Sequence, residues 1–570
     1  MAARFRIKPP FYPIVYVRGY AMSGSERTDT FHDGYYGFGS TSVRRLQGPP
    51  DPDRYLQADV FEGQLVRFIK DFGYADAINR GNRIDSLAAE MAADADAEVR
   101  PPYRMNLRNP SRSLWISRFY DSDVLGNRLR GIEEHAADLL SLITEIIPAQ
   151  LESCDVDLGP KRADYKVILL AHSMGGLVCR TVMQNLLPTS KLPKADRDPK
   201  RWIHRLVTMG TPHRGIDLSV LPNGVEQWLA NTLNANDSGI FQPDQMRRYL
   251  RLTGYSDREV HSLGDPADPL HFPAKRCLCI VGSNYRDYSV ANGLAKVATG
   301  SFSDGLVKQS NAYAVEGRAA PDGSFPPERT AFYANVHRAH SGYEGIVNSY
   351  ESWENIHRFL FGDVLADVAL RDLRLHTAPP DKARQERVTY DIEFSLSVKG
   401  TQTKLHERRQ DPCENAMRYE HAALAQANAP IALHTVFLNS NLKKDASEPF
   451  LHFVLMLRVT EHRVREAAGL GGLFDKVKHL VGVEADYLPL PVYSETAEIR
   501  VGDLDPTSPG FEVQYRWASD AAVGAAWRTA NKTKTDSGLQ YFIELREANS
   551  LSGKLAISAR RWPDRSLTLD

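Results

Sequence analysis

Short apolar runs follow one another through the first part of the chain, and segments of helical periodicity lie between them. The runs are Ile14–Val17, Leu114–Ile116, Val167–Leu170, Leu206–Met209 and Cys277–Val281. Their residues are apolar almost throughout rather than alternately, which is typical of strands covered on both faces, as in a parallel sheet. The alternation of such strands with helices predicts an α/β unit over residues 1–365.

The clearest helical stripe lies between the second and third runs. Its apolar residues recur in steps of three and four: Leu129, Ile132, Ala136, Leu139, Ile143 and Ile146. This spacing places them on one face of a helix, and we expect Pro148 to end it. Strand, helix and strand in this order form a right-handed crossover unit. A further amphipathic helix is expected over Ile346–Leu360, anchored by Trp353, Ile356 and Phe359.

Two long segments interrupt the α/β pattern. Residues 34–109 are rich in Gly, Pro, Asp and Arg and contain one helical patch, Phe61–Phe72. Residues 217–273 contain two helical candidates, Val225–Leu233 and Gln245–Leu252. Insertions of this length in α/β enzymes usually form a cap or lid over the site. The alternative is surface decoration without a gating role.

Beyond about residue 365 the apolar period changes to two. The strand-like segments are Val388–Val398, Phe450–Val459, Ala497–Val501, Phe511–Trp517, Phe542–Leu545 and Leu555–Ile557. Alternation punctuated by Pro, Gly and Asp predicts an antiparallel β-sandwich over residues 381–570. We expect a linker near Leu365–Asp381 and one helix-like interruption, Glu461–Val481.

Composition bounds the size and the partners of the protein. At about 150 residues per domain, 570 residues are too many for one core. Lys and Arg number 70 against 71 Asp and Glu, a formal net charge of -1, so no global field favours nucleic acid. We therefore expect no nucleic-acid partner.

The chain start and the cysteines bear on location. No apolar run near the N-terminus is long enough for a signal-peptide core, and no run anywhere approaches the roughly 18 residues of a membrane span. The five cysteines are sparse and odd in number, which is typical of reduced thiols. These features predict a cytoplasmic protein; export without a signal peptide is the alternative.

Ser173 directly follows an apolar strand and precedes a helical segment, in Val167-Ile-Leu-Leu-Ala-His-Ser-Met-Gly-Gly-Leu-Val. A nucleophile on such a sharp strand-to-helix turn needs small residues two before and two after it, here Ala171 and Gly175. The helix start points its N–H groups toward a developing oxyanion. The pattern predicts Ser173 as a nucleophile, with Gly175 and Gly176 as the glycines of the turn. The alternative is a glycine-rich turn without catalysis, and we interpret the adjacent His172 as structural.

Three segments resemble bacterial lipases and the PGAP1-like lipase group, over about residues 12–362. They are Ala171-His-Ser-Met-Gly-Gly176, Thr208-Met-Gly-Thr-Pro-His-Arg-Gly215 and Ile14-Val-Tyr-Val-Arg-Gly-Tyr20. The resemblance implies an α/β-hydrolase fold, with an oxyanion hole formed by the backbone N–H groups of Tyr20 and Met174. Arg18 stands where the family usually has His.

The resemblance also implies the acid and the base, which follow the serine in the order acid, then His. Gly300-Ser-Phe-Ser-Asp-Gly-Leu-Val307 is similar to the lipase segment that carries the acid, which makes Asp304 the candidate and Asp287 its rival; a plain Asp-Gly turn is the alternative. The base is expected just past the strand candidate Phe332–Val336. There His340 matches better than His337. Tyr120-Asp121 resembles a structural pair of these lipases.

The sequence thus predicts a serine ester hydrolase that acts on lipid-like esters. No spaced Cys/His set suggests a metal site, and no phosphate-binding or dinucleotide motif suggests a cofactor. An acyltransferase with the same triad, a toxin-like lipolytic effector and a non-catalytic binding protein are the alternatives. Besides the ester substrate, we expect a membrane surface or a protein as partner of the C-terminal domain.

Overall fold

The computed structural model describes residues 5–19, 44–47, 57–60, 63–76, 110–117, 131–216, 238–287, 302–341, 345–381, 386–401, 403–426, 429–443, 447–465, 489–502, 510–521, 524–535, 538–546 and 550–562. The chain divides into two compact units, Met1–Ile356 and His357–Asp570. The division falls within helix α14 (Tyr350–Phe361).

A seven-stranded sheet forms the centre of the first unit, and every pair of neighbours in it is parallel. In sheet order its strands are β5 (Ala75–Asp76), β6 (Ser113–Ser117), β2 (Ile14–Val17), β8 (Val167–His172), β9 (Ile203–Met209), β10 (Cys277–Gly282) and β11 (Phe332–Val336). All residues of β2, β8, β9 and β10 are buried, which explains why their sequences are mostly apolar rather than alternating; β9 also buries the polar residues His204, Arg205 and Thr208. The prediction of a parallel sheet with helices is confirmed.

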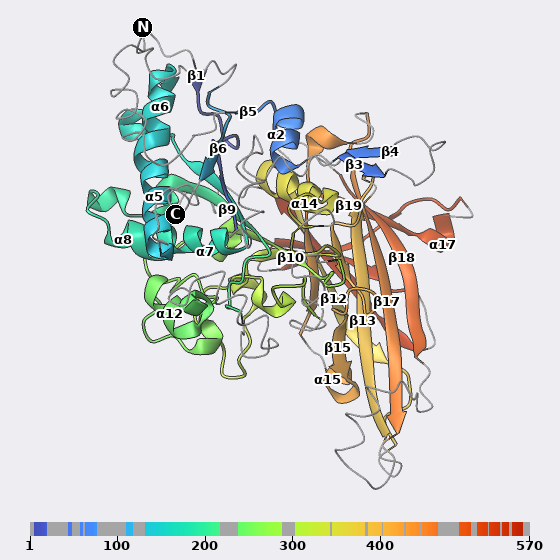
Figure 1. The fold of residues 1–570 in the computed structure, drawn as a ribbon. Helices are drawn as coiled ribbons and strands as arrows, with labels where there is room; N and C mark the ends of the chain where they lie inside the picture. The colour runs from blue at the N-terminus through green and yellow to red at the C-terminus, as the bar shows by residue number, and fades with distance from the viewer. Residues whose placement is uncertain are drawn as a thin grey trace, which may run out of the picture. The chain divides into compact units, whose positions relative to one another are not determined.

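Helices cover both faces of this sheet. Figure 1 shows α5 (Ile132–Ser141), α6 (Ile147–Ser153) and α7 (Met174–Thr181) on one side, with α2 (Gln64–Phe72) and α14 on the other. The rings of Phe68 in α2 and Trp353 in α14 meet edge to face, 4.8 Å between centroids, which packs these two helices together.

The helix before β8 does not end at Pro148, so that prediction is wrong. A π-helical turn, Leu142–Ile146, connects α5 to α6, and Pro148 lies in the first turn of α6. In the π turn the N–H of Ile147 reaches back five residues to the carbonyl of Leu142. This shift in hydrogen-bond register lets the helix continue past a residue that has no N–H to donate. The same arrangement, a π turn at Val182–Leu186, precedes Pro188 in α8 (Leu187–Thr189).

The two predicted insertions are described in part. The first contains α2, which matches the expected helical patch, and an antiparallel hairpin of β3 (Arg44–Gln47) and β4 (Gln57–Val60). In the second, α12 (Pro243–Tyr249) lies where a helix was expected, whereas the candidate Val225–Leu233 is outside the described residues. Their role as a cap stays a prediction.

Short elements complete the first unit. They are the parallel pair β1 (Phe5–Arg6) and β7 (Val156–Asp157), helix α9 (Pro199–Trp202), and 3-10 turns at Pro160–Arg162, Lys194–Asp196, Ser238–Phe241, Asp257–Glu259, Ala274–Arg276, Gln309–Asn311 and Pro327–Arg329.

The second unit is an antiparallel β-rich body of two sheets. One has the order β16 (Ile431–Leu438), β12 (Val364–Leu375), β23 (Leu551–Arg561), β22 (Gly538–Glu544) and β21 (Asn531–Thr535). The other has the order β14 (His406–Arg408), β13 (Glu386–Val398), β17 (Leu451–Arg465), β18 (Leu490–Gly502), β19 (Glu512–Trp517) and β20 (Arg528–Thr529), with β15 (Met417–Glu420) also paired to β13. Short helices lie at α15 (His421–Ala425) and α17 (Ala518–Ala521), and a 3-10 turn lies at Ser440–Leu442. Alternate residues of both sheets contribute to one hydrophobic core.

Two expectations for this unit differ from the structure. The segment expected as linker begins with β12, whose buried Val364, Ala366, Val368 and Leu370 alternate toward the core. The expected helix-like segment, Glu461–Val481, begins inside β17, which pairs with β13 as far as Arg465, and its remainder is outside the described residues. Over Glu461–Arg465 cross-strand pairing outweighs the local sequence signal.

Candidate active site

Ser173 stands at the sharp turn between β8 and α7. Its backbone has φ 51° and ψ −128°, a region that residues with a side chain rarely occupy. The turn is possible because the neighbouring residues are small: a Cβ on Gly175 would lie 2.4 Å from the carbonyl oxygen of Val17, and one on Gly176 would lie 2.2 Å from Oγ1 of Thr211. Strain of this kind is found at functional sites, and here it places the serine hydroxyl beyond the end of the strand.

The structure brings His340 and Asp304 to this serine. Nε2 of His340 lies 3.0 Å from Oγ of Ser173, and Nδ1 of His340 lies 2.8 Å from Oδ2 of Asp304. All three side chains are buried. The backbone N–H of His340 also donates to the carbonyl of Asp304 at 2.8 Å, so the two loops that carry the base and the acid are tied together.

The hydrogen bonds of Asp304 fix the proton arrangement. Its Oδ1 accepts the backbone N–H groups of Leu306 (3.0 Å) and Val307 (2.7 Å), so Oδ2 is the oxygen that faces His340. An ionised Oδ2 only accepts, so Nδ1 of His340 carries the proton. Nε2 is then left with its lone pair toward Ser173, as a general base requires.

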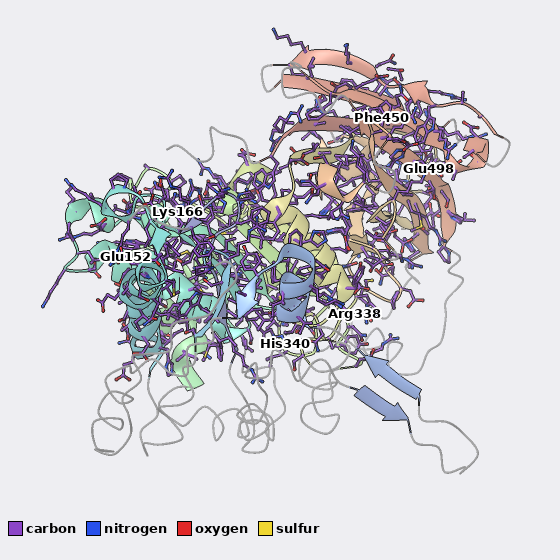
Figure 2. The ribbon with its side chains drawn as sticks, turned by 90° about the horizontal axis from the view of Figure 1, so that it is seen from above. Glu152, Lys166, Arg338, His340, Phe450 and Glu498 are labelled. Atoms are coloured by element: carbon purple, nitrogen blue, oxygen red, sulfur yellow. The ribbon has the colours of Figure 1, made fainter. Side chains whose placement is uncertain are left out.

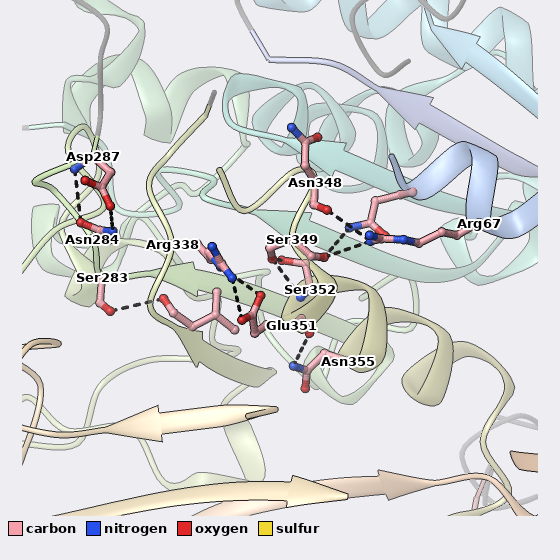
Figure 3. A network of polar contacts seen from close by, with 12 residues as sticks. Arg67, Ser283, Asn284, Asp287, Arg338, Asn348, Ser349, Glu351, Ser352 and Asn355 are labelled. Carbon is pink, nitrogen blue, oxygen red and sulfur yellow. Dashed lines mark hydrogen bonds and ion pairs between the residues drawn. The ribbon is translucent and has the colours of Figure 1, made fainter. Parts of the chain in front are cut away.

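An ion pair anchors the loop that carries the base. The Arg338 guanidinium meets the Glu351 carboxylate of α14 through two hydrogen bonds, Nε to Oε2 at 3.0 Å and a terminal nitrogen to Oε1 at 2.9 Å (Figure 3). Figure 2 labels Arg338 and His340 close to each other in the same loop. A bidentate pair of this kind limits the movement of the backbone on which His340 depends.

The rival residues lie in other environments. Asp287 accepts a hydrogen bond from the Asn284 amide at 2.6 Å, and Nδ1 of His337 faces the hydroxyl of Ser283 at 3.3 Å. Nε2 of His172 lies 3.0 Å from the carbonyl of His340 and therefore donates to it. Burial, with a smaller effect of the nearby His340, holds the pKa of His172 well below its ordinary value, so His172 is neutral and supports the base loop.

One of the two expected oxyanion donors can be placed. Met174 is the first residue of α7, so its N–H has no acceptor within the helix and lies beside the serine. Tyr20, like the pair Tyr120-Asp121, is outside the described residues.

Gly19 allows the first strand to approach the serine. A Cβ at this position would lie 2.6 Å from Cβ of Ser173. We expect Gly19→Ala to lower kcat/KM by roughly a hundredfold, because a displacement near 1 Å is enough to misplace a reacting group. Gly131→Ala is the control, since its added methyl group meets nothing within 4 Å. Ester hydrolysis by both variants measures the difference, and a fully active Gly19→Ala protein would show that the close approach has no catalytic consequence.

Two polar residues that tie the serine turn and helix α7 to neighbouring segments were not identified from the sequence. Thr211 donates from Oγ1 to the carbonyl of Ser173 at 2.8 Å. Arg180 in α7 is fully buried and donates to the carbonyls of His213, Val260 and Ser262 at 2.7 to 2.9 Å. Burial lowers its pKa to about 10, so it stays cationic at neutral pH. A lone arginine between apolar helix positions was the available signal.

We expect Arg180→Lys to lower the free energy of unfolding by about 2–4 kcal/mol, since one ammonium group cannot satisfy three buried carbonyls in the guanidinium geometry. Arg162→Lys is the control, because the surface pair of Arg162 with Glu152 contributes about 0–1 kcal/mol. Urea unfolding followed by circular dichroism compares the two, and equal stability of both variants would contradict the expectation.

Two features of the described part of the chain concern metal binding and membrane spanning. There, no group of three or more His, Cys, Asp or Glu side chains is arranged to hold a metal ion. Within the same ranges, no helix combines the length and apolarity needed to cross a bilayer.

No protein-family model matches the chain, and no curated protein matches it. Solved structures with some likeness include a lipase from Bacillus licheniformis, BlEst2 (14% identity, 60% of this chain and 88% of that one, TM-score 0.27). Phospholipase PlaB from Legionella pneumophila has 10% identity over 78% of this chain and 86% of its own, with a TM-score of 0.31. EstA from Clostridium botulinum has 14% identity over 60% and 84%, with a TM-score of 0.24. With TM-scores this low, these structures are not evidence for the function of the chain. Its function is inferred from the geometry of the site.

Proposed function

We propose that the protein is a serine ester hydrolase of the α/β-hydrolase type, with an appended β-sandwich, that acts through Ser173, His340 and Asp304. One observation carries the proposal: a serine on a strained strand-to-helix turn, 3.0 Å from an imidazole whose other nitrogen faces a buried carboxylate at 2.8 Å. The nucleophile thus contacts the base, and the base contacts the acid that orients it, which is the arrangement that acyl transfer requires.

The mechanism has two acyl-transfer steps. Nε2 of His340 takes the Ser173 proton as Oγ attacks the ester carbonyl, and the imidazolium that forms is stabilised by Asp304. The N–H of Met174, together with that of Tyr20, stabilises the oxyanion. His340 then returns the proton to the leaving alcohol, and water activated by the same imidazole releases the acyl group.

The lipid-like character of the substrate is supported by an aromatic residue beside the acid. Phe302, two positions before Asp304, keeps 56% of its surface exposed and has φ 69°, a conformation that costs energy for a bulky residue. An exposed phenyl ring on a strained backbone, two residues before the proposed catalytic acid, is suited to contact an apolar acyl chain. An acyltransferase with the same residues is distinguished by adding an alcohol acceptor and analysing the products.

A series of p-nitrophenyl esters tests the substrate class. We expect kcat/KM to rise from acetyl to octanoyl esters, and Phe302→Ala to reduce that rise by about fivefold to tenfold, because each buried methylene contributes about 0.8 kcal/mol. Tyr350→Ala removes another exposed aromatic side chain of the first unit and should leave the series unchanged. Best activity on acetyl esters, with no effect of Phe302→Ala, would instead indicate an esterase for small substrates.

A further inference from the structure

A cavity of about 470 Å³ lies within the second unit, separate from every residue of the proposed active site. Its wall is formed by the last turns of α14, the segment after β13, the 3-10 turn after β16 and the start of β17. Lys399 and Leu442 on this wall are exposed, so the cavity opens to solvent. Its size is within the range of small-molecule binding sites.

The charged side chains of the wall favour an anion. Among the described residues that line the cavity, Arg358, Lys399 and Lys443 are cations and Glu448 is the one carboxylate, an excess of two positive charges (three minus one). His452 adds none, since burial lowers its pKa and its Nε2 is held by Glu448 at 2.8 Å. Lys443 is held in place by a hydrogen bond from Nζ to the carbonyl of Glu448 at 3.0 Å. Cations gathered around a small cavity create a positive potential that an anionic group would relieve.

Part of the wall is apolar. Leu438, Leu442 and Phe450 line it alongside the cations and the polar residues Asn439 and His452. A free inorganic anion gains nothing from this surface, whereas an anion joined to an apolar body contacts both kinds of wall.

Aromatic and guanidinium groups continue outward from Phe450, which Figure 2 labels among the strands of this unit. The Arg500 guanidinium lies 4.2 Å from the ring centroids of both Phe450 and Trp527, and that of Arg516 lies 4.7 Å from Trp527. Glu498 partners Arg516 on the same face. Aromatic rings are enriched at membrane–water interfaces, and basic residues near such a surface are attracted to anionic lipid headgroups.

We propose that this cavity binds a phosphate group carried on an apolar body, which is the chemistry of an anionic phospholipid. Phosphate oxygens accept charge-assisted hydrogen bonds from Lys399, Lys443 and Arg358, while the adjoining carbons contact Leu442 and Phe450. The second unit would thereby attach the protein to an anionic lipid surface. The inference does not rest on the proposed hydrolysis, since no residue of the triad lines the cavity.

Calorimetric titration of the full chain with dioctanoyl phosphatidic acid, below its micelle concentration, tests this site. The protein carries Ser173→Ala so that any hydrolysis cannot consume the ligand. We expect saturable binding of one ligand, weakened at least about tenfold by the double substitution Lys399→Gln and Lys443→Gln, since two charge-assisted hydrogen bonds to the phosphate are lost. Lys532→Gln with Lys534→Gln, two exposed lysines of β21, changes the net charge equally and should leave the affinity unchanged.

Titrations with other ligands, and the comparison of the two double variants, show which chemical feature of the ligand is recognised. Equal affinity for inorganic phosphate would show a site for free anions, and equal affinity for dioctanoyl phosphatidylcholine would show binding without charge recognition. Equal weakening by both double variants would show only general electrostatic attraction. Each of these results overturns the proposal.

A photoactivatable analogue of the same lipid provides a measurement that needs no substitution in the cavity. Mass spectrometry should find it attached to residues that line the cavity, such as Leu442 or Phe450. Attachment confined to other parts of the chain would overturn the proposal even if a lysine variant failed to fold.

Discussion

Replacing Ser173 with alanine should lower kcat for ester hydrolysis by about 10⁴–10⁶-fold, because no other group in the site can form the acyl-enzyme. Ser173 is 9% exposed. Its replacement by alanine removes one oxygen atom and keeps the Cβ that the turn accommodates. The melting temperature should therefore change little. The measurement is turnover of a p-nitrophenyl ester by purified wild type and variant, with circular dichroism as the folding control.

A residual rate near wild type would mean that another serine or a bound water performs the attack. A loss of activity that accompanies a large loss of helical signal would indicate unfolding instead. Only a folded and inactive variant agrees with a nucleophilic role for this residue.

Replacing His340 should have an effect of similar size, whereas replacing His337 should lower kcat by less than about tenfold. His340 lies 3.0 Å from the serine hydroxyl and 2.8 Å from the carboxylate of Asp304, so its loss removes both the base and the contact that orients it. His337 lies three residues away in the same loop and faces Ser283. The pair is a matched comparison of two histidines on one loop.

Steady-state kinetics of His340→Ala and His337→Ala measure the contrast. An active His340→Ala protein beside an inactive His337→Ala protein would reverse the assignment of the base. Asp304→Asn adds a graded test, since the amide keeps the shape of the side chain but cannot stabilise the imidazolium. We expect it to lose about 10⁴-fold in kcat.

The sequence predicted the elements whose signals are local. β2 and β11 begin and end at the expected residues, because every residue of β2 and all but Tyr333 of β11 are buried and polar or small residues bound both runs. The strand-to-helix turn at Ser173 was predictable because its small residues are adjacent in sequence, although the contacts that require Gly175 and Gly176 come from Val17 and Thr211. Asp304 and His340 could be proposed only from resemblance, because their approach to Ser173 depends on the order of strands in the sheet.

Most of the features that were missed depend on distant contacts. Strand β12 pairs with both β16 and β23, and the alternation of Val364, Ala366, Val368 and Leu370 was a local signal that the expected linker left out. The helix continues past Pro148 because a π turn changes its hydrogen-bond register. Arg180 has its role because three carbonyls from two later segments converge on it. Periodicity reports which side of an element is buried, and it does not report which atoms will meet there.

Covalent labelling tests the central claim most directly. The wild-type protein is incubated with a fluorophosphonate, digested and analysed by peptide mass spectrometry. The proposed mechanism predicts one adduct, on Ser173, whose formation parallels the loss of esterase activity and which His340→Ala forms far more slowly. An adduct on a different serine, or complete inactivation with Ser173 unmodified, would contradict the assignment of Ser173 as the nucleophile.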